Sequence, residues 1–406
     1  MKQVKLGEIA TIYNGNSINQ SVKKQKYMND VPGWNYIATK DVGVDGKITY
    51  QNGVIIPYSE KGFRIAPAGS VFVCSEGGSA GKKTAVLQED VCFGNKLFAI
   101  VNDKGLYNEK YLFYYTRFER FREQFKLLAT SLMGGISVKN FSAIKVPLCI
   151  LQDQHRIVSC IEELFSQLDS GVETLKKTKE QLKVYRQAVL KEAFESASSS
   201  NSKNLTIIDL LTKKKKGMTT GPFGTMLKKH EHQSSGVPVL GIENIGKVGF
   251  VDGNKIFVSE EKAKELSAFK VDTDDLIISR SGTVGEICIV PPHMKNALLS
   301  TNLMRISLDF DVIRADYFMY LFKSKGVVID QVKELCKGST RMFLNQTILK
   351  QIIFPVPTLK IQAKIIETIE SRLSVCDSIE KTIDTALQEA EALRQSILKQ
   401  AFEGGL

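Results

Sequence analysis

The sequence lacks the cysteine patterns of a disulfide framework or a zinc site. Its seven cysteines are scattered along 406 residues, odd in number and never spaced C-x-x-C. Such usage is typical of proteins from a reducing cytosol. The residues from Met1 to Glu8 lack the apolar core of a signal peptide, and no stretch approaches the ~18 consecutive apolar residues of a membrane span. We therefore expect a cytoplasmic protein that reaches no membrane.

Recognisable catalytic motifs are also missing. The sequence contains no G-x-S-x-G element, no convincing Cys/His pair and no N-P-P-aromatic tetrapeptide of amino-methyltransferases. These absences predict a recognition or scaffold protein rather than a catalyst. We also expect that this chain binds no cofactor.

Two short segments imitate binding motifs. The run Gly77–Thr84 resembles a phosphate-binding loop, but three residues separate its glycines where four are required, and Lys83 stands where Ser or Thr is needed. A tight turn after a strand is the favoured interpretation. His230-Glu231-His232 lies beside Lys228 and Lys229, so a solvated or phosphate-facing loop is favoured over a metal site.

What the sequence does contain is an internal duplication. Residues 144–196 align with 352–404 at a constant offset of 208 without a gap, and 18 of the 53 positions are identical. Two copies are too few for a solenoid, which needs about three. They imply a two-fold-like molecule made from one chain, which suits a two-part target or two identical partners.

The duplication extends more weakly through the preceding parts of each copy. Residues 34–42 parallel 237–245, and residues 63–81 parallel 269–285. Short apolar runs broken by glycine predict strands, and three- or four-residue apolar spacing predicts helices. The predicted strands include 71–73, 97–100 and 276–278, and the predicted helices cover 109–126 and 315–333.

Each copy ends in a long amphipathic helix. Apolar residues alternate at spacings of three and four from Ile157 to Ala193 and from Ile365 to Ala401, which indicates a coiled-coil seam. Each helix spans about 44 residues, or about 66 Å at ~1.5 Å per residue. Because neither can bury its apolar stripe alone, we expect the two to pair as an antiparallel rod. A coiled coil between two chains is the alternative.

These patterns predict an α+β fold. Two pseudo-two-fold related mixed α/β domains are each followed by a long helix, and the two helices form an antiparallel coiled coil. Pro147, Pro355 and Pro357 end the globular parts. The predicted segments are a first domain (1–150), a helix (151–196), a small polar linker (197–204), a second domain (205–357) and a C-terminal helix (358–406).

The formal net charge of +11 favours an acidic partner, with nucleic acid first and an acidic membrane second. A merely soluble basic protein remains an alternative. Lysine runs neutralise phosphates, and rigidly held arginines read base edges. The lysines of Lys23–Tyr27 are interpreted as counterparts of Lys213–Lys216 and the nearby pair in the second copy. The candidate DNA-binding residues are Lys23, Lys24, Lys26, Lys82, Lys83, Lys214, Lys215, Lys216, Lys228, Lys229, Arg280, Arg305 and Arg341.

The whole chain resembles the DNA-specificity subunit of type I restriction-modification systems. Gly221–Lys228 resembles the opening of a target-recognition domain, Ser279–Gly285 resembles its mid-domain turn, and Phe354–Pro357 leads into the helix as in the family. The chain departs from the family at the helix starts. Asp153-Gln154 and Ile361-Gln362 stand where Glu-Gln is usual, and Cys149 stands where a second proline is common.

The resemblance implies a function. Each globular domain would read one half of a split double-stranded DNA target, while the helices would fix the gap and dock two methyltransferase subunits. Those subunits would bind S-adenosylmethionine, and a separate motor-nuclease subunit would use ATP and Mg²⁺. The alternatives are the specificity subunit of a methylation-only system, a coiled-coil scaffold without DNA contact and a self-sufficient enzyme.

Overall fold

A computed structural model describes residues 1–28, 31–129, 134–198, 202–223, 225–246, 249–282, 284–324, 326–335 and 343–405. The chain divides into two compact units. Unit 1 combines Met1–Leu175 with Asp384–Leu406, and unit 2 is Lys176–Ile383. The boundary therefore falls inside both long helices and not at the predicted linker. Each unit holds one globular domain, the beginning of one helix and the end of the other.

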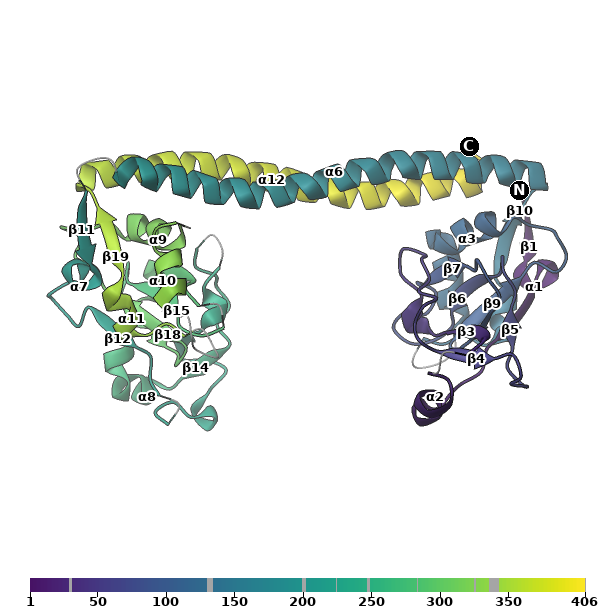
Figure 1. Ribbon diagram of the computed structural model, residues 1–406, viewed down its shortest axis with the longest axis horizontal. Coiled ribbons are helices and arrows are strands. Elements are labelled where there is room, and N and C mark those ends of the chain that lie inside the picture. The colour runs from purple at the N-terminus through teal and green to yellow at the C-terminus, as the bar shows by residue number, and fades with distance from the viewer. Residues whose placement is uncertain are drawn as a thin grey trace. The chain divides into compact units, whose positions relative to one another are not determined.

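The first domain is built on two four-stranded sheets and a two-stranded ribbon (Figure 1). The sheet orders are β2-β9-β6-β7 and β4-β3-β8-β5, and the ribbon is β1-β10. Its elements are β1 (Lys2–Lys5), α1 (Leu6–Ile9), β2 (Thr11–Asn14), α2 (Gln20–Lys26), β3 (Gly33–Ile37), η1 (Thr39–Asp41), β4 (Ile55–Pro57), β5 (Ile65–Ala66), β6 (Val71–Cys74), β7 (Thr84–Val86), β8 (Val91–Phe93), β9 (Leu97–Val101), α3 (Glu109–Arg117), α4 (Glu119–Leu128), α5 (Val138–Ser142) and β10 (Lys145–Leu148).

The second domain repeats this plan with the sheets β12-β18-β15-β16 and β14-β13-β17 and the ribbon β11-β19. Its elements are β11 (Lys203–Thr206), α7 (Ile207–Leu210), β12 (Met218–Thr220), η2 (Lys229–Glu231), β13 (Val237–Leu240), η3 (Ile242–Asn244), β14 (Ile256–Val258), α8 (Glu260–Glu265), η4 (Ser267–Phe269), β15 (Leu276–Ser279), β16 (Ile287–Ile289), η5 (Pro292–Met294), β17 (Leu298–Leu299), β18 (Leu303–Ile306), α9 (Ala315–Lys323), α10 (Ile329–Leu335), α11 (Gln346–Gln351) and β19 (Ile353–Val356).

Strand pairing confirms the duplicated framework. The parallel pair β3–β8 has its counterpart in β13–β17, and the antiparallel ribbon β1–β10 has its counterpart in β11–β19. The apolar runs predicted as strands form β6, β9 and β15, whose side chains are almost all buried. Both sheet faces are therefore covered, which explains why these strands are apolar at every position.

The predicted helices 109–126 and 315–333 are each broken in two, contrary to the continuous pattern. The first breaks at Phe118, whose backbone is extended with φ −73° and ψ 141°. The second breaks after α9 at Ser324, with φ −74° and ψ 126°. Phe118 is 5% exposed and Ser324 is fully buried. Each break turns the chain so that the following helix also faces the core, an effect that sequence periodicity alone does not reveal.

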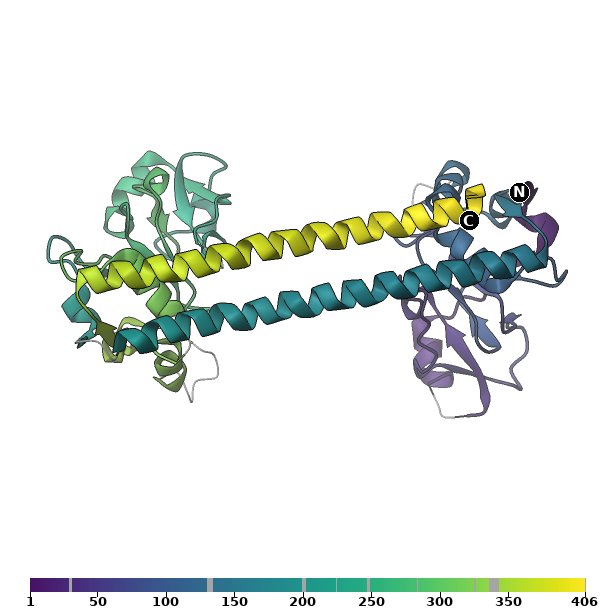
Figure 2. The ribbon, with the colours of Figure 1, turned by 90° about the horizontal axis from the view of Figure 1, so that it is seen from above.

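The long helices are α6 (Leu151–Ser198, 48 residues) and α12 (Leu359–Glu403, 45 residues). They pair antiparallel in both units (Figure 2). In unit 1 Arg394 pairs with Asp169, and in unit 2 Arg186 lies 2.6 Å from Asp377. Exposed ion pairs contribute little to the free energy of folding. The helix pair is stabilised mainly by the apolar residues buried along its seam. Its residues include Ile157, Ile161, Leu182, Val189, Ile369, Cys376, Ile383 and Ile397, all at most 8% exposed. Pairing within one chain is thereby confirmed.

A buried glutamine fixes the start of each long helix to its domain. Gln154 accepts a hydrogen bond from the backbone N–H of Asn108 at 2.8 Å, and Gln362 accepts one from Arg314 at 2.9 Å. Each side-chain amide also donates to two backbone carbonyls, and both glutamines are 0% exposed. The glutamine at each helix start is thus a buried structural residue.

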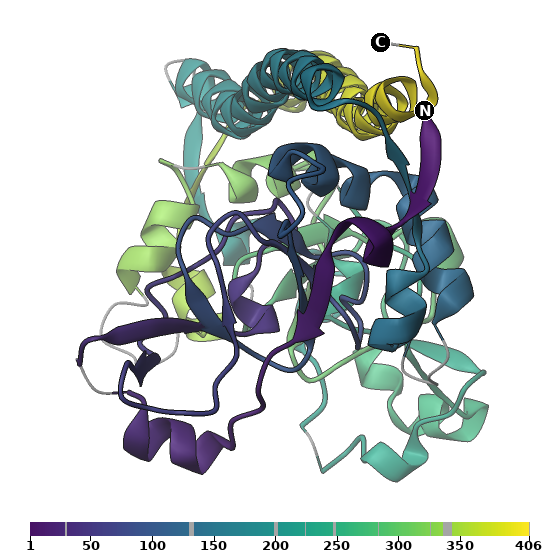
Figure 3. The same cartoon turned by 90° about the vertical axis from the view of Figure 1, so that its right-hand side faces the viewer.

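An aromatic residue fixes the end of each long helix to the opposite copy's domain. The C-terminal end of α12 lies near the N-terminus of the chain, within unit 1 (Figure 3). Phe402, near this end of α12, packs its ring 5.1 Å from Tyr111 of α3. Phe194, near the end of α6, packs 5.4 Å from Tyr317 of α9. The two tyrosine hydroxyls donate to equivalent backbone carbonyls of β10 and β19. Each domain is therefore completed by a helix end that belongs to the other repeat. Among the helices that the structure describes, none is long and apolar enough to cross a membrane.

Candidate nucleic-acid interface

The positive charge of the chain belongs to its globular domains. Residues 1–150 contain 20 lysines and arginines against 12 aspartates and glutamates, and residues 205–357 contain 21 against 16. The remaining residues, which include both long helices, contain 14 against 16. Attraction for a polyanion is thus concentrated on the domains.

Helix α2 presents the lysines of the first domain. Lys23 lies over the ring of Tyr36 with its Nζ 4.9 Å from the centroid, and burial lowers the pKa of Lys23. Lys26 pairs with Glu60 at 2.7 Å, while Lys24 is exposed. The three predicted lysines therefore share one short helix, but two of them are already engaged with neighbouring side chains.

The glycine-rich segment of the first domain is the predicted tight turn after a strand. It follows β6 and uses positive φ angles at Gly77 (80°) and Gly81 (66°), which only glycine adopts without strain. Lys82 donates to the carbonyl of Gly78 at 3.3 Å, and Lys83 donates to that of Thr39 at 3.0 Å. Lys82 is exposed and Lys83 is partly buried, so Lys82 is the more accessible cation.

The corresponding turn of the second domain carries Arg280. The backbone N–H of Arg280 donates to Asn302 at 2.9 Å, just as that of Ser75 donates to Lys96 at 2.9 Å. Arg280 therefore occupies the position of Ser75, which is 4% exposed. The next position also differs, because Glu76 pairs with Lys96 whereas Ser281 donates to Asn302. The same turn of the duplicated framework therefore presents different polar side chains in the two domains.

The guanidinium of Arg280 is held in a fixed orientation. It stacks over the ring of Phe343 at 4.6 Å and donates to the carbonyls of Leu344 at 3.3 Å and Thr301 at 3.2 Å. Partial burial lowers the pKa of Arg280. An arginine held in this way loses little conformational entropy on binding a base edge. Arg280 remains the best-organised candidate for base reading.

The loop after β12 adds an exposed aromatic residue that the sequence did not single out. A Cβ atom added at Gly221 would lie 1.9 Å from the carbonyl oxygen of Ser300, so the backbone at Gly221 passes close to the backbone just after β17. Beyond it Phe223 is 73% exposed and Met226 is 40% exposed, just before Lys228. Exposed aromatic side chains next to lysines suit contact with nucleic acid.

The segment around η2 contains the second domain's Lys228, Lys229 and the two histidines. Glu231 accepts from the backbone N–H of Lys228 at 2.6 Å and pairs with Lys262 at 2.8 Å. Both lysines and His230 are exposed. Across the described ranges, no group of three or more His, Cys, Asp or Glu side chains is arranged to hold a metal ion.

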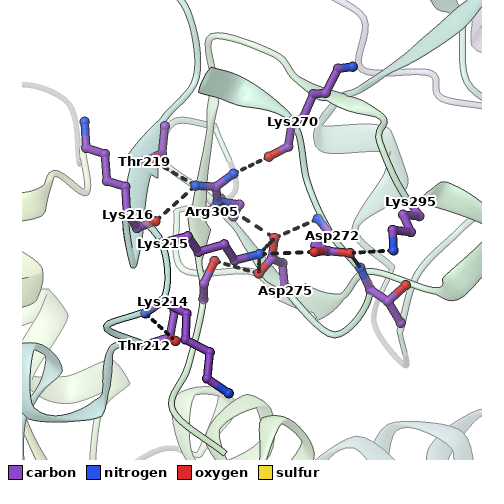
Figure 4. A network of polar contacts seen from close by, with 12 residues as sticks. Thr212, Lys214, Lys215, Lys216, Thr219, Lys270, Asp272, Asp275, Lys295 and Arg305 are labelled. Carbon is purple, nitrogen blue, oxygen red and sulfur yellow. Dashed lines mark hydrogen bonds and ion pairs between the residues drawn. The ribbon is translucent and has the colours of Figure 1, made fainter. Parts of the chain in front are cut away.

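Arg305, a predicted base-reading residue, is buried in the structure and is not displayed on the surface of the domain. It lies on β18, is 7% exposed, and is surrounded by protein acceptors and the carboxylate of Asp275 (Figure 4). Burial lowers the pKa of Arg305, and Asp275 acts in the opposite direction. Lys214, Lys215 and Lys216 are all exposed, and Lys215 also pairs with Asp275 at 3.0 Å. Arg341 lies outside the described residues.

Comparisons with known proteins agree with this arrangement. The family model for the type I restriction modification DNA specificity domain matches residues 1–184 and 205–389. The chain is 24% identical over 428 residues to the type I restriction enzyme EcoBI specificity subunit of Escherichia coli, covering 100% of this chain and 86% of that protein. It is 23% identical over 376 residues to the StySPI specificity subunit of Salmonella potsdam, covering 89% and 80%.

Solved structures share the fold. The HsdS subunit from Thermoanaerobacter tengcongensis matches with a TM-score of 0.57 and 15% identity, covering 100% of this chain and 97% of that one. A chain from a structure describing complex assembly and conformational transition of the type I R-M system matches with a TM-score of 0.77 and 16% identity, covering 100% and 98%. Two copies of the family's domain together match most of the sequence, so the chain belongs to the family of type I restriction-modification DNA-specificity subunits.

Proposed function

We propose that each globular domain of this specificity subunit reads one half of a bipartite DNA target. The observation that carries this proposal is the repeated framework with unlike surfaces. Arg280 and Ser281 occupy positions that Ser75 and Glu76 hold in the first domain. Because arginine and glutamate prefer different base edges, two such domains are suited to two different half-sites.

The paired helices serve as the spacer and as the docking site for two methyltransferase subunits. Their exposed surface supports docking, since Val375 is 59% exposed, Tyr185 is 49% exposed and Ile379 is 40% exposed. Apolar side chains on an otherwise polar helix pair are typical of a surface that a partner covers. The methyltransferase subunits would supply S-adenosylmethionine, and a motor-nuclease subunit would supply ATP and Mg²⁺ chemistry.

The cytoplasm is the compartment that we propose for this complex. All six cysteines within the described residues are free. Unpaired cysteines are typical of a reducing compartment.

Domain exchange tests the proposal directly. Replacing residues 207–352 with the same segment of a relative is expected to change one half-site and to leave the other unchanged. These limits keep the native ribbon, in which Leu205 faces Phe354. The target is mapped by sequencing methylated DNA from a host that carries the variant with its partners. Simultaneous change of both half-sites would show that the domains do not read independently.

The isolated chain is expected neither to methylate nor to cut DNA, because its sequence has no catalytic motif. The measurement is transfer of a labelled methyl group from S-adenosylmethionine to target DNA, together with cleavage in the presence of ATP and Mg²⁺. Adding the methyltransferase subunits should restore methylation. Activity of the contaminant-free chain would contradict the expectation.

A further inference from the structure

The second domain contains a basic insertion that the first domain lacks. In the first domain α1 ends at Ile9 and β2 begins at Thr11, whereas in the second α7 ends at Leu210 and β12 begins at Met218. The longer connection carries Lys213–Lys216, and all four lysines are exposed. The segment matching α2 of the first domain follows β12 and contains η2. The lysines of α2 therefore correspond to Lys228 and Lys229 alone, which corrects the interpretation that they also match Lys213–Lys216; the four-lysine run has no counterpart in the first domain.

A buried arginine holds the backbone at the end of this insertion. The Nη2 atom of Arg305 donates to the carbonyl of Lys216 at 3.0 Å and to the hydroxyl of Thr219 at 3.1 Å (Figure 4). Its Nη1 atom donates to the carbonyl of Lys270. One guanidinium thus connects the insertion, the first residues of β12 and the segment before β15.

A buried aspartate holds the side chain of the insertion's third lysine. Asp275 is 3% exposed, and its Oδ1 lies 3.0 Å from the Nζ of Lys215. The same carboxylate accepts from the hydroxyl of Ser307 at 2.6 Å and from the backbone N–H of Asp272 at 2.7 Å. Arg305 lies beside it, with 3.8 Å between Nε and Oδ2. Because the carboxylate is hydrogen-bonded as well as paired, its burial is tolerated.

The buried Arg305–Asp275 pair and the lysine insertion occur in the same domain, the second, and both are missing from the first. Strand β12 pairs with β18 in the register of β2 with β9, so Arg305 occupies the position of Ala99. Strand β15 pairs with β18 as β6 pairs with β9, so Asp275 occupies the position of Ser70. The first domain has neither the charges nor the lysine run. Because the first domain forms the same sheets without these two charged residues, the sheets of the second domain do not require them either.

We propose that Arg305 and Asp275 are positioning residues for a phosphate-binding turn, Lys213–Lys216, which contacts the DNA backbone beside the half-site read by the second domain. The inference rests on the proposed function. Lys215 anchors the turn, and the exposed Lys213, Lys214 and Lys216 contact phosphates. Fixing the main chain at Lys216 and the side chain of Lys215 reduces the conformational entropy lost on binding. The second domain therefore contributes a larger salt-dependent share of affinity than the first.

The test uses the full-length chain with the subunits that co-purify with it. Affinity for a target duplex is measured by fluorescence anisotropy from about 50 to 200 mM salt. Three phosphate contacts contribute about 2.7 to the slope of log affinity against log salt. Replacing Lys213, Lys214 and Lys216 with alanine should remove that share, so the wild type loses about 40-fold more affinity across this range than the variant. Sequence preference should not change.

Two further variants test the positioning role. The double variant Arg305→Ala, Asp275→Ser carries the first domain's residues, and it should lower the salt slope although every phosphate-contacting lysine is present. Asp275→Asn keeps the size and one acceptor but loses the charge facing Lys215, so it should lower the slope partly even if the double variant fails to fold. Faster amide hydrogen exchange at 213–216 should accompany both, with β15 and β18 still protected in Asp275→Asn.

The outcomes are separable. An unchanged slope in the triple lysine variant would overturn the phosphate contact. A normal slope in folded Asp275→Asn and in the folded double variant would overturn the positioning role. Absence of specific DNA binding by the wild-type complex would instead overturn the proposed function, and the same titration reports it.

Discussion

Replacing Phe402 with alanine is expected to destabilise the first domain, although this residue follows the whole second domain in the sequence. Phe402 is 4% exposed, and its ring lies 5.1 Å from Tyr111, 5.2 Å from Tyr115 and 6.1 Å from Phe118. Removing a buried phenylalanine costs about 3–5 kcal/mol. Hydrogen exchange should show faster exchange in α3 and β10 of unit 1, while unit 2 keeps its protection.

The repeat supplies the matched control for this experiment. Phe194 is fully buried against Tyr317, so Phe194→Ala should transfer the same loss of protection to α9 and β19 of unit 2. Loss of protection in both units for either variant would contradict the assignment of each helix end to one domain. No loss in either would mean that these aromatic contacts contribute little to stability.

Lengthening the helix pair by one turn is expected to widen the gap between half-sites. Four residues add about 6 Å at ~1.5 Å per residue, or roughly one to two base pairs of B-DNA at ~3.4 Å each. Arg186 lies opposite Asp377, so an insertion after Lys179 is level with one after Ile383. Inserting four residues at both places keeps the antiparallel register, with a local stutter in the seam. The bases read at either end should stay the same.

Methylation sequencing of the lengthened variant gives both the gap and the half-sites. The control inserts the same four residues after Ser202, before β11 and outside the helix pair, and should leave the target unchanged. An active lengthened variant with an unchanged gap would mean that the helices tether the domains without measuring distance. Loss of all activity in the lengthened variant alone would indicate that a shift of about a tenth of a turn per base pair already prevents simultaneous contact.

The sequence was informative where one pattern repeats over many residues. The helix pair followed from a seam of more than thirty residues, and the duplicated framework followed from 18 identities in 53 positions. Gln154 and Gln362 were also visible, because the same residue stands at the same place in both copies. Their role was not visible, since it depends on backbone groups of Asn108 and Arg314 about fifty residues away.

The candidate site was less predictable because side-chain roles depend on partners far along the chain. Arg305 resembles a surface cation, yet its neighbours Leu303, Met304 and Ile306 leave no exposed face on β18. That apolar setting was the available signal for burial. Arg280 gains its fixed orientation from Phe343 and Leu344, more than sixty residues later, which no local pattern indicates.

The division of the chain into units also bears on how it folds during synthesis. Unit 2 is one continuous segment, Lys176–Ile383, whereas unit 1 needs Asp384–Leu406, which is synthesised after all of unit 2. The usual order, in which the N-terminal domain folds first, cannot be completed here. At roughly 5–20 residues per second, about 10–42 seconds separate the synthesis of the two parts of unit 1. Throughout that interval Tyr111 and Tyr115 lack their contact with Phe402, so unit 1 begins to be synthesised before unit 2 but is completed only after it.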